Sequence, residues 1–423
     1  MTISPPAKVK TAYFGQASIL CSNLDKLDLS IDVTWLDNSF FKRLTYWKNY
    51  AKNNRQDFSV SLLPYPAGQE MKCLVKPFGK EGYEWFLVGS EYTLRIGNWM
   101  EPGAKPSVFA EISSETLWRL GPKMALKRLL SILRGQGASI VSIKPSRVDL
   151  CVDMLMDEGI WKMDLIQYRV TRSAYCSPHF HKAKMTGMSI GKGKVSAKLY
   201  DKPLEIKQQS KKYWMFPIWG LEKVPDGKRI IRTEFQLMRE AIKDLGIDKI
   251  GELFASLDNV WAYCTQKWLK FQSNPGKHHT QRKTFPWWIT VQSGFSGNLK
   301  ATPLIRFKAS AGKEEQLFSQ AYGLHTSIEA QNLESWNGAK DLPPSTLKMA
   351  LNGFRHHADT YGKGAFNFMD EVERKRAKYQ RTDLKMLEVD KERRRHGMPS
   401  NFTDEQLKRA TATQERLNLQ GGD

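Results

Sequence analysis

Two short segments far apart in the chain share one alternation of acidic and apolar residues. Residues 27–32 read LDLSID, and residues 148–153 read VDLCVD. Successive side chains of a β-strand point to opposite faces, so acids four positions apart lie on the same face. The pattern therefore predicts two strands, each with apolar residues on one face and carboxylates on the other.

A leucine-rich helix between strands forms the clearest predicted unit. Leucines at 126, 129, 130 and 133 have helical spacing and predict a helix over 122–134. Strands are expected over 107–112, ending at a Ser113-Ser114 helix start, and over 140–154. This order indicates an α+β fold with an antiparallel-rich central sheet and helices on one face, followed by a mostly helical C-terminal region.

Further strands are indicated by short apolar runs between turn residues. We expect hairpins from 85–88 to 92–96 and from 188–190 to 195–200, a helix over 164–172, and a strand over 230–237 that leads into a helix over 238–245. Thr403 and Gln406 have capping-box spacing. A polar segment over 273–279 suggests a boundary. We therefore expect α+β halves over 1–105 and 106–272, and a helical, basic region over 273–423.

The charge of the chain is the property that most limits the class of partner it can bind. Its 65 lysines and arginines exceed its 44 acids, which gives a net charge of +21, and 11% of its residues are aromatic. This balance favours a nucleic acid as partner, although a merely basic or ribosome-associated protein has the same composition. No apolar run approaches the roughly 18 residues of a membrane span. Five scattered cysteines and a start without signal-peptide order predict a cytoplasmic protein.

Tyr200 is the candidate nucleophile, in the sequence KLYDK at 198–202. A tyrosine hydroxyl can attack a phosphodiester and retain the DNA end as a phosphotyrosine ester. Lys198 and Lys202 are spaced to share its strand face, where they would lower the pKa of the phenol and bind phosphates. The alternative is an ordinary strand tyrosine between solvated lysines.

Four acids are candidate ligands for Mg²⁺ or Mn²⁺, which prefer carboxylate oxygens: Asp149, Asp153, Glu234 and Glu111. The alternative is that Asp149 pairs with Arg147 and Glu234 with Arg232 as salt bridges. His179 and His181 form an H-x-H pair, the ligand signature of another class of tyrosine nickases, and stay a second option. Residues that could bind DNA phosphates are basic: Lys192, Lys194, Lys198, Arg147 and Arg232.

The order of these segments resembles the replication initiation factors of the Rep_trans family, which are rolling-circle initiators of plasmids with relatives in phages and conjugative elements. The likeness covers about residues 25–250 and depends on motif order and spacing. The matching runs are FAEIS at 109–113, SRVDLCVD at 146–153, SIGKGK at 189–194, KLYDK at 198–202 and IRTEF at 231–235.

The resemblance implies a metal-dependent enzyme that nicks and rejoins one strand of origin DNA through a 5′-phosphotyrosine intermediate. Tyr200 matches the nucleophile and Lys202 the lysine that follows it. The four acids named above match the divalent-metal site. Implied partners are double-stranded origin DNA and single-stranded DNA, with a host helicase or polymerase and a second copy of the chain as further candidates.

The chain departs from the family pattern at residues 188–194, which read MSIGKGK where the family has Y-x-G-S-R-x-S, and at Lys198, where arginine is common. Contacts to phosphates near the tyrosine therefore differ from the family's. Two other functions stay open: a conjugative relaxase with the same chemistry, and a DNA-binding regulator without catalysis.

Overall fold

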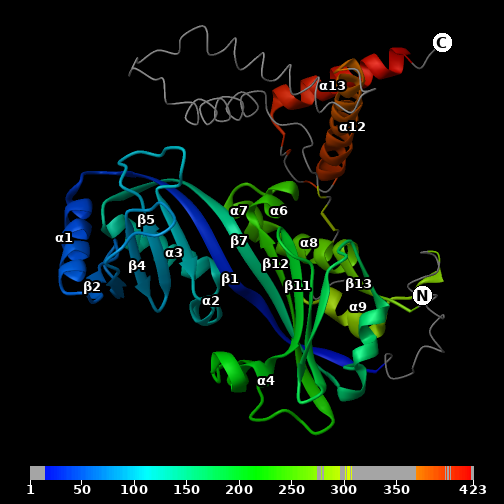
Figure 1. The fold of residues 1–423 in the computed structure, drawn as a ribbon, viewed down its shortest axis with the longest axis horizontal. Coiled ribbons are helices and arrows are strands. Elements are labelled where there is room, and N and C mark those ends of the chain that lie inside the picture. Colours follow the sequence, from blue (N-terminus) through cyan, green and yellow to red (C-terminus); the bar gives the residue numbers. More distant parts are fainter. Residues whose placement is uncertain are drawn as a thin grey trace, which may run out of the picture. The chain divides into compact units, whose positions relative to one another are not determined.

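The computed structural model describes residues 15–273, 281–295, 368–395 and 402–420, with the single positions 278, 301, 303, 304, 306, 397 and 400. The chain divides into two compact units, residues 1–306 and 307–423 (Figure 1). The expected boundary at 273 lies beside residues 274–277, which fall outside the described residues.

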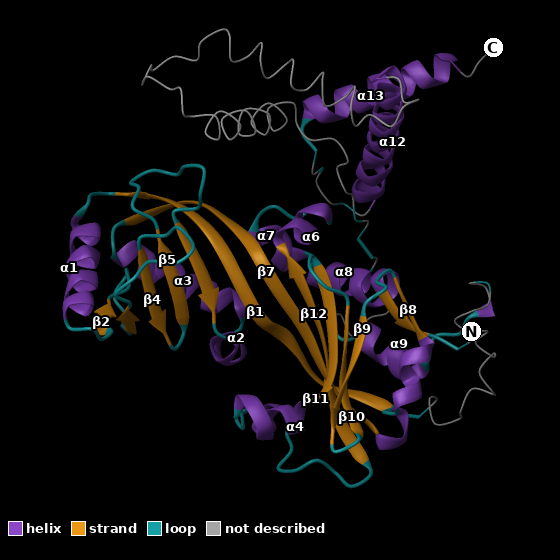
Figure 2. Ribbon diagram, in the orientation of Figure 1, coloured by secondary structure: helices purple, strands orange, loops and turns teal. Residues whose placement is uncertain are grey.

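The first unit is built on one eleven-stranded sheet in which every neighbouring pair is antiparallel (Figure 2). The predicted antiparallel α+β fold is thus confirmed. The strand order is β2-β3-β4-β5-β6-β1-β7-β12-β11-β10-β9. The strands are β1 (Ala17–Trp35), β2 (Phe58–Leu62), β3 (Met71–Val75), β4 (Trp85–Gly89), β5 (Tyr92–Ile96), β6 (Val108–Ile112), β7 (Ala138–Asp157), β9 (Cys176–His181), β10 (Lys184–Ile190), β11 (Val195–Asp201) and β12 (Lys228–Met238).

The two acid-bearing segments lie next to each other at the centre of this sheet. They belong to β1 and β7, which have 19 and 20 residues, and Leu27 pairs with Val148. Four irregularities interrupt this pairing, including one between Leu24 and Lys26 that leaves Asp25 out of register. Such bulges re-aim side chains and increase the twist of a sheet.

Most helices of the first unit cover the apolar face of the sheet. The Tyr92 hydroxyl donates to the Ala125 carbonyl oxygen in α3 at 2.9 Å, and the Phe235 ring meets Trp261 of α8 at 5.3 Å. Helices of this layer are α1 (Ser39–Asn53), α3 (Pro122–Gly135), α6 (Arg239–Asp244), α7 (Ile250–Ala255), α8 (Leu257–Ala262) and α9 (Pro286–Gln292), with the π-helical turn η5 (Tyr263–Trp268).

The opposite face carries the acids and is partly covered by three short helices, α2 (Ser114–Leu120), α4 (Lys202–Glu205) and α5 (Met215–Trp219). The Trp118 indole of α2 donates to Asp25 at 3.0 Å, and the Trp219 indole of α5 donates to Asp153 at 2.8 Å. The π-helical turn η4 (Ile206–Ser210) extends α4. This face holds the candidate site.

Most predicted elements are confirmed, and one is wrong in part. Leu126, Leu129 and Leu133 are buried in α3, and the Ser113 hydroxyl accepts the Thr116 N–H that begins α2. The helix expected over 164–172 is the 3₁₀ helix η3 (Met163–Tyr168), after a 3₁₀ turn η2 (Glu158–Ile160). The chain then extends as β8 (Arg169–Thr171), because it pairs with the distant strand β13 (Leu269–Phe271).

The described helices of the second unit are α12 (Phe368–Arg395) and α13 (Asp404–Gln420). They agree with the helical C-terminal region predicted from the sequence. Asp383 joins them by accepting from Arg409 at 2.9 Å and from Thr413 at 3.0 Å. The capping box at Thr403 and Gln406 is present. Among the described residues, no helix combines the length and the hydrophobicity that a bilayer crossing requires.

Candidate functional site

Tyr200 lies near the end of β11, in the hairpin with β10. It is opposite Gly187 on one side and Arg232 of β12 on the other. A side chain on Gly187 would start 3.0 Å from the Tyr200 Cβ and 3.0 Å from the Leu199 carbonyl oxygen. The glycine therefore leaves the space beside the phenol ring open.

The Tyr200 hydroxyl donates a hydrogen bond of 2.9 Å to the Glu234 carboxylate. Burial raises the pKa of the phenol well above its usual value, and the negative Glu234 raises it further. Burial also raises the pKa of Glu234, as do the nearby carboxylates of Asp25 and Asp149. The pair therefore consists of a protonated phenol and a carboxylate with increased affinity for a proton.

The two flanking lysines have different environments. Lys198 pairs across the strands with Glu234, on the same face, and is exposed. Lys202 lies just beyond the strand, because β11 ends at Asp201, whose side chain accepts the Leu204 N–H and begins α4. The Lys202 ammonium is buried, bonds Glu205 at 2.6 Å and lies 5.6 Å from the centre of the Tyr200 ring.

The pKa of the phenol is raised and not lowered as expected, because burial is the largest cause of its shift. Burial also lowers the pKa of Lys202 itself, and the positive charge of Arg232 adds to this effect. Lys202 is therefore a buried cation beside the phenol, while Lys198 is the exposed one.

Arg232 is the centre of a buried ionic network beside Tyr200. Its guanidinium, which has no exposed surface, binds both oxygens of Asp153 at 2.6 and 2.8 Å and one of Asp25 at 2.9 Å. It also lies 5.5 Å from the centre of the Trp118 ring. Arg232, predicted to bind DNA, is therefore buried away from the surface. Asp153, predicted to bind a metal ion, forms a salt bridge with it.

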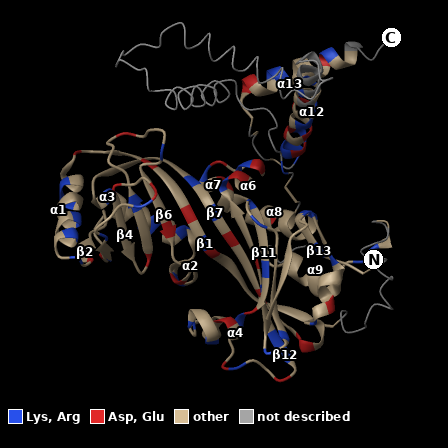
Figure 3. Ribbon diagram, in the orientation of Figure 1, with Lys and Arg blue, Asp and Glu red and all other residues tan. Residues whose placement is uncertain are grey.

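The other two acids are also paired, in line with the salt-bridge alternative for Asp149. The Arg147 guanidinium binds both oxygens of Asp149, at 2.9 and 2.6 Å. Glu111 accepts from Lys26 at 2.6 Å and from Arg95 at 2.5 Å, several strands away from Tyr200. Figure 3 shows acidic and basic residues together along β1 and β7.

The ion pairs of these carboxylates determine whether a metal ion could bind to them. Mg²⁺ and Mn²⁺ need carboxylate oxygens that are not already neutralised by arginine. Across the described part of the chain, no three histidine, cysteine, aspartate or glutamate side chains converge in a way that would hold a metal ion. In this arrangement the four acids do not fit a divalent-metal centre, and no chemical step is derived through a metal.

A cavity of about 430 Å³ opens at Tyr200, which is partly exposed. Glu234, Lys198 and His179 line it. The His179 Nε2 is 2.8 Å from the Ser189 hydroxyl, whereas the His181 Nδ1 is 3.1 Å from the Gln208 amide nitrogen. The H-x-H pair is therefore engaged by polar side chains, and only its first member lines the Tyr200 cavity.

The basic hairpin tip forms as predicted, between β10 and β11. Gly191 and Gly193 both have a φ of 82°, a left-handed conformation that glycine adopts without strain. The Lys192 ammonium lies 3.9 Å from the centre of the Tyr175 ring, and Lys194 pairs with Glu240 at 3.0 Å. Both lysines are exposed, and their contact with DNA phosphates stays a prediction.

Sequence reasoning missed two residues of the site. Asp25 is the out-of-register residue of β1, and the alternation of apolar and polar positions could not place it on the acid-bearing face. Trp219 reaches Asp153 from α5, a contact between residues 66 positions apart. No motif or spacing in the sequence predicts either contact.

Comparison with known proteins gives a distant structural likeness. No protein-family model matches the chain, and no curated protein matches it. A solved structure of a rolling circle replication initiator protein from Geobacillus stearothermophilus is similar with a TM-score of 0.37 and 12% sequence identity. The match covers 69% of this chain and 99% of the other.

Proposed function

We propose that the chain is an initiator of rolling-circle replication that nicks and rejoins single-stranded origin DNA through Tyr200. The observation that carries this proposal is the 2.9 Å hydrogen bond from the Tyr200 hydroxyl to Glu234 at the wall of an open cavity. The motif order of the sequence and the positive charge of the chain support it.

In the proposed reaction, Glu234 accepts the proton of the Tyr200 hydroxyl while the phenol oxygen attacks the scissile phosphorus. The bond from phosphorus to the 3′ oxygen breaks, and that oxygen takes up a proton to become a free 3′ hydroxyl. The 5′ phosphate stays on Tyr200 as a diester. Attack by a 3′ hydroxyl on this diester reverses the step and rejoins the strand.

The cations near Tyr200 have separate roles in this proposal. Lys198, exposed beside Glu234, binds the phosphate that enters the cavity. Lys202, buried against the phenol ring, compensates the negative charge that develops there. The requirement for Mg²⁺ or Mn²⁺ stays a prediction from the family resemblance, and it is tested by adding either ion or a chelator.

The test uses supercoiled plasmids that carry the DNA surrounding the gene of this chain. The wild-type protein should convert one of them into nicked circles and remain covalently attached. Tyr200→Phe should bind the same DNA and lose at least a thousandfold in nicking, and Glu234→Gln should lose about a hundredfold. Tyr46→Phe, on the exposed surface of α1, serves as the matched control with unchanged activity.

Full nicking by Tyr200→Phe would reject the proposal. A DNA-binding regulator is the second candidate, favoured by the raised pKa of Tyr200 and by the salt bridges of Asp149 and Asp153. It would bind the DNA of its origin and yield no nicked circle with either metal ion. A conjugative relaxase would nick in the same way, and genes for conjugative transfer beside its own would distinguish it.

A further inference from the structure

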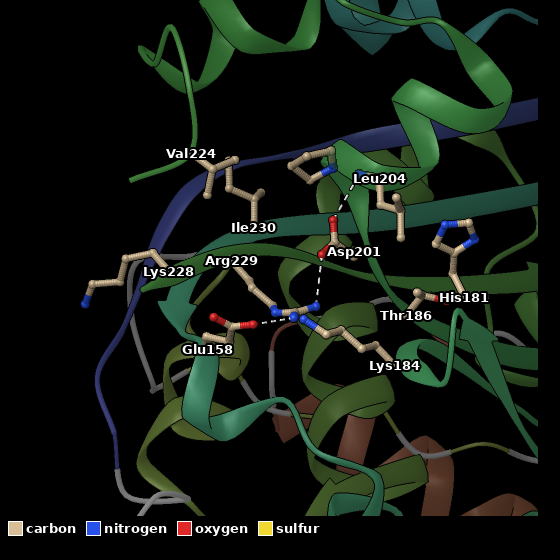
Figure 4. Close-up of a pocket in the computed structure, with 11 residues that line it drawn as sticks. Glu158, His181, Lys184, Thr186, Asp201, Leu204, Val224, Lys228, Arg229 and Ile230 are labelled. Carbon is tan, nitrogen blue, oxygen red and sulfur yellow. Dashed lines mark hydrogen bonds and ion pairs between the residues drawn. The ribbon is translucent and has the colours of Figure 1, made fainter. Parts of the chain in front are cut away.

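A second cavity, of about 390 Å³, adjoins the one at Tyr200. Figure 4 shows the residues that line it. The two cavities share the side chains of Thr186, Asp201 and Leu204 as common wall. The volume is within the range of sites for small organic ligands, roughly 300–1,000 Å³. A molecule that extends beyond Tyr200 in this direction therefore enters a second space of defined size.

One side of the second cavity is apolar and rigid. Its side chains are Pro203, Leu204, Val224 and Ile230. Ile230 has no exposed surface and belongs to a hydrophobic cluster with Trp219 of α5. A wall supported by such a cluster keeps its shape and offers a flat ligand apolar contact without having to reorganise.

The other side of the cavity is polar and holds both donors and acceptors. The Arg229 guanidinium binds Asp201 at 3.3 Å and Glu158 at 2.5 Å, and Lys184 extends toward them (Figure 4). The Arg229 Nε is buried and has no hydrogen-bond partner among the described residues. Because this atom has no accessible surface, the groups that the cavity offers to a ligand are the other nitrogens of the guanidinium, the Lys184 ammonium and the two carboxylates.

We propose that this cavity binds the unstacked base of a nucleotide adjacent to the one that Tyr200 attacks. A nucleobase has a planar apolar face and an edge with donors and acceptors, which matches the apolar wall and the Arg229 side of the cavity. A free phosphate matches it less well, because Asp201 and Glu158 already neutralise Arg229. The proposal rests on the proposed nicking function, which makes the ligand DNA.

The common wall of the two cavities limits the proposal to a nucleotide near the one that Tyr200 attacks. Asp201 directly follows Tyr200 in the chain, and its carboxylate is held by the Leu204 N–H at 2.9 Å. Asp201 is therefore a fixed part of the wall between the two cavities. Such a base pocket would select the nucleotide beside the nick and hold the strand in place for attack.

The experiment measures binding of the four deoxynucleoside 5′-monophosphates to the full chain by isothermal titration, with deoxyribose 5-phosphate and inorganic phosphate as probes that lack a base. At least one nucleotide should bind tenfold or more tightly than either probe. Val224→Trp and Thr186→Phe, which fill the cavity from opposite sides, should each weaken it at least tenfold. Val141→Trp, an exposed position of β7, is the matched control.

Equal binding of deoxyribose 5-phosphate would show an anion site without base recognition and would overturn the proposal. Nucleotide binding that neither Val224→Trp nor Thr186→Phe weakens would also overturn it, as would the absence of saturable binding. Tyr200→Phe should keep the nucleotide affinity of the wild type. Nucleotide binding without any nicking by the wild type would instead reject the proposed function and leave the base pocket standing.

Discussion

At the scale of single residues, the interior around Tyr200 depends on charges that compensate one another. Arg232 and Asp153 have no exposed surface, and Asp25 completes the group. An ion pair of this kind costs solvation free energy when it forms, and it costs much more when one partner is removed. The network therefore fixes the positions of β7 and β12 beneath the phenol.

Asp153→Asn should lower the free energy of unfolding by about 3–5 kcal/mol, because the Arg232 guanidinium then stays buried with less negative charge around it. Urea denaturation measures the change. Asp157→Asn is the control, since its pair with Lys228 lies at the surface and contributes less than about 1 kcal/mol. Equal losses in the two variants would contradict the assigned role of the buried network.

Asp28 should make the stability of the protein depend on pH. Burial raises the pKa of its carboxyl to about 6, above its usual 3.8, and the neighbouring Glu111 adds to the shift. The folded chain therefore holds this proton more tightly than the unfolded chain does. The contribution of Asp28 to stability is complete below pH 3.8 and is lost as the pH rises to about 6.

Asp28→Asn should remove this dependence and raise the free energy of unfolding at pH 7 by up to about 3 kcal/mol. Urea denaturation at several values between pH 4 and pH 7 follows the effect. Asp226→Asn, at an exposed position, should leave the pH profile unchanged. A parallel profile for Asp28→Asn and the wild type would show that another group causes the dependence.

The sequence could identify which residues belong to the site, but it could not identify which of them contact one another. It pointed to Tyr200 and Glu234 separately, and the structure brings them to hydrogen-bonding distance. It left open whether Asp149 binds a metal or Arg147, because both options need the same residues on one strand face. The contacts of Asp25 depend on a β-bulge. A bulge interrupts the alternation of apolar and polar residues on which the prediction of the two faces was based.

At the scale of elements, the β10–β11 hairpin positions Tyr200, and its turn depends on two glycines. Gly191 and Gly193 have the same φ of 82°. A Cβ on Gly191 would lie 2.8 Å from the Trp268 ring, whereas one on Gly193 would meet nothing within 4 Å. The two positions therefore separate the cost of backbone conformation from the cost of a steric clash.

Gly193→Ala should lower the free energy of unfolding by about 1–2 kcal/mol through its left-handed backbone alone. Gly191→Ala should lower it further, because the Trp268 ring must move as well. Thermal or urea denaturation of the two variants provides the comparison. If Gly191→Ala lowered the free energy of unfolding less than Gly193→Ala does, the close packing of the turn against Trp268 would not contribute to stability.

Elements set by local sequence were predictable, and those set by distant partners were not. The leucine spacing of α3 and the turn glycines act within a few residues, so their pattern is visible in the sequence. Strand β8 directly follows a 3₁₀ helix and extends because β13, about a hundred residues away, pairs with it. Periodicity carries no information on such a partner.

At the scale of the whole molecule, the net charge of +21 should dominate DNA binding. The logarithm of the binding constant for single-stranded DNA should fall linearly with the logarithm of the salt concentration, by about 0.7 per phosphate contact. Lys198→Ala should reduce that slope by about 0.7, since this lysine is exposed beside Tyr200. Fluorescence anisotropy at several salt concentrations measures it.

Lys127→Ala is the matched control for this measurement. It removes an exposed lysine from α3, which packs on the opposite face of the sheet, and should leave the slope unchanged. A slope that is the same for Lys198→Ala and the wild type would place the bound strand away from Tyr200. The total charge was evident from the sequence. Which face of the sheet carries the exposed lysines could be seen only in the folded structure.

The order of all eleven strands was beyond prediction because it depends on the central pairing of β1 with β7. That pairing joins residues more than a hundred positions apart, such as Ser22 and Val152. Local patterns predicted the antiparallel class, whereas the number of strands and their sequence across the sheet follow from this long-range contact.

The length of β1 and β7 also limits how the first unit can move. Each strand spans roughly 60 Å at about 3.3 Å per residue, and each carries partners from both halves of the sheet. A hinge between the halves would have to break the ladder of the two longest strands at once. Closure of one half on the other would therefore require a break in both strands, and in the proposed function the DNA strand enters a cavity at Tyr200 that is already formed.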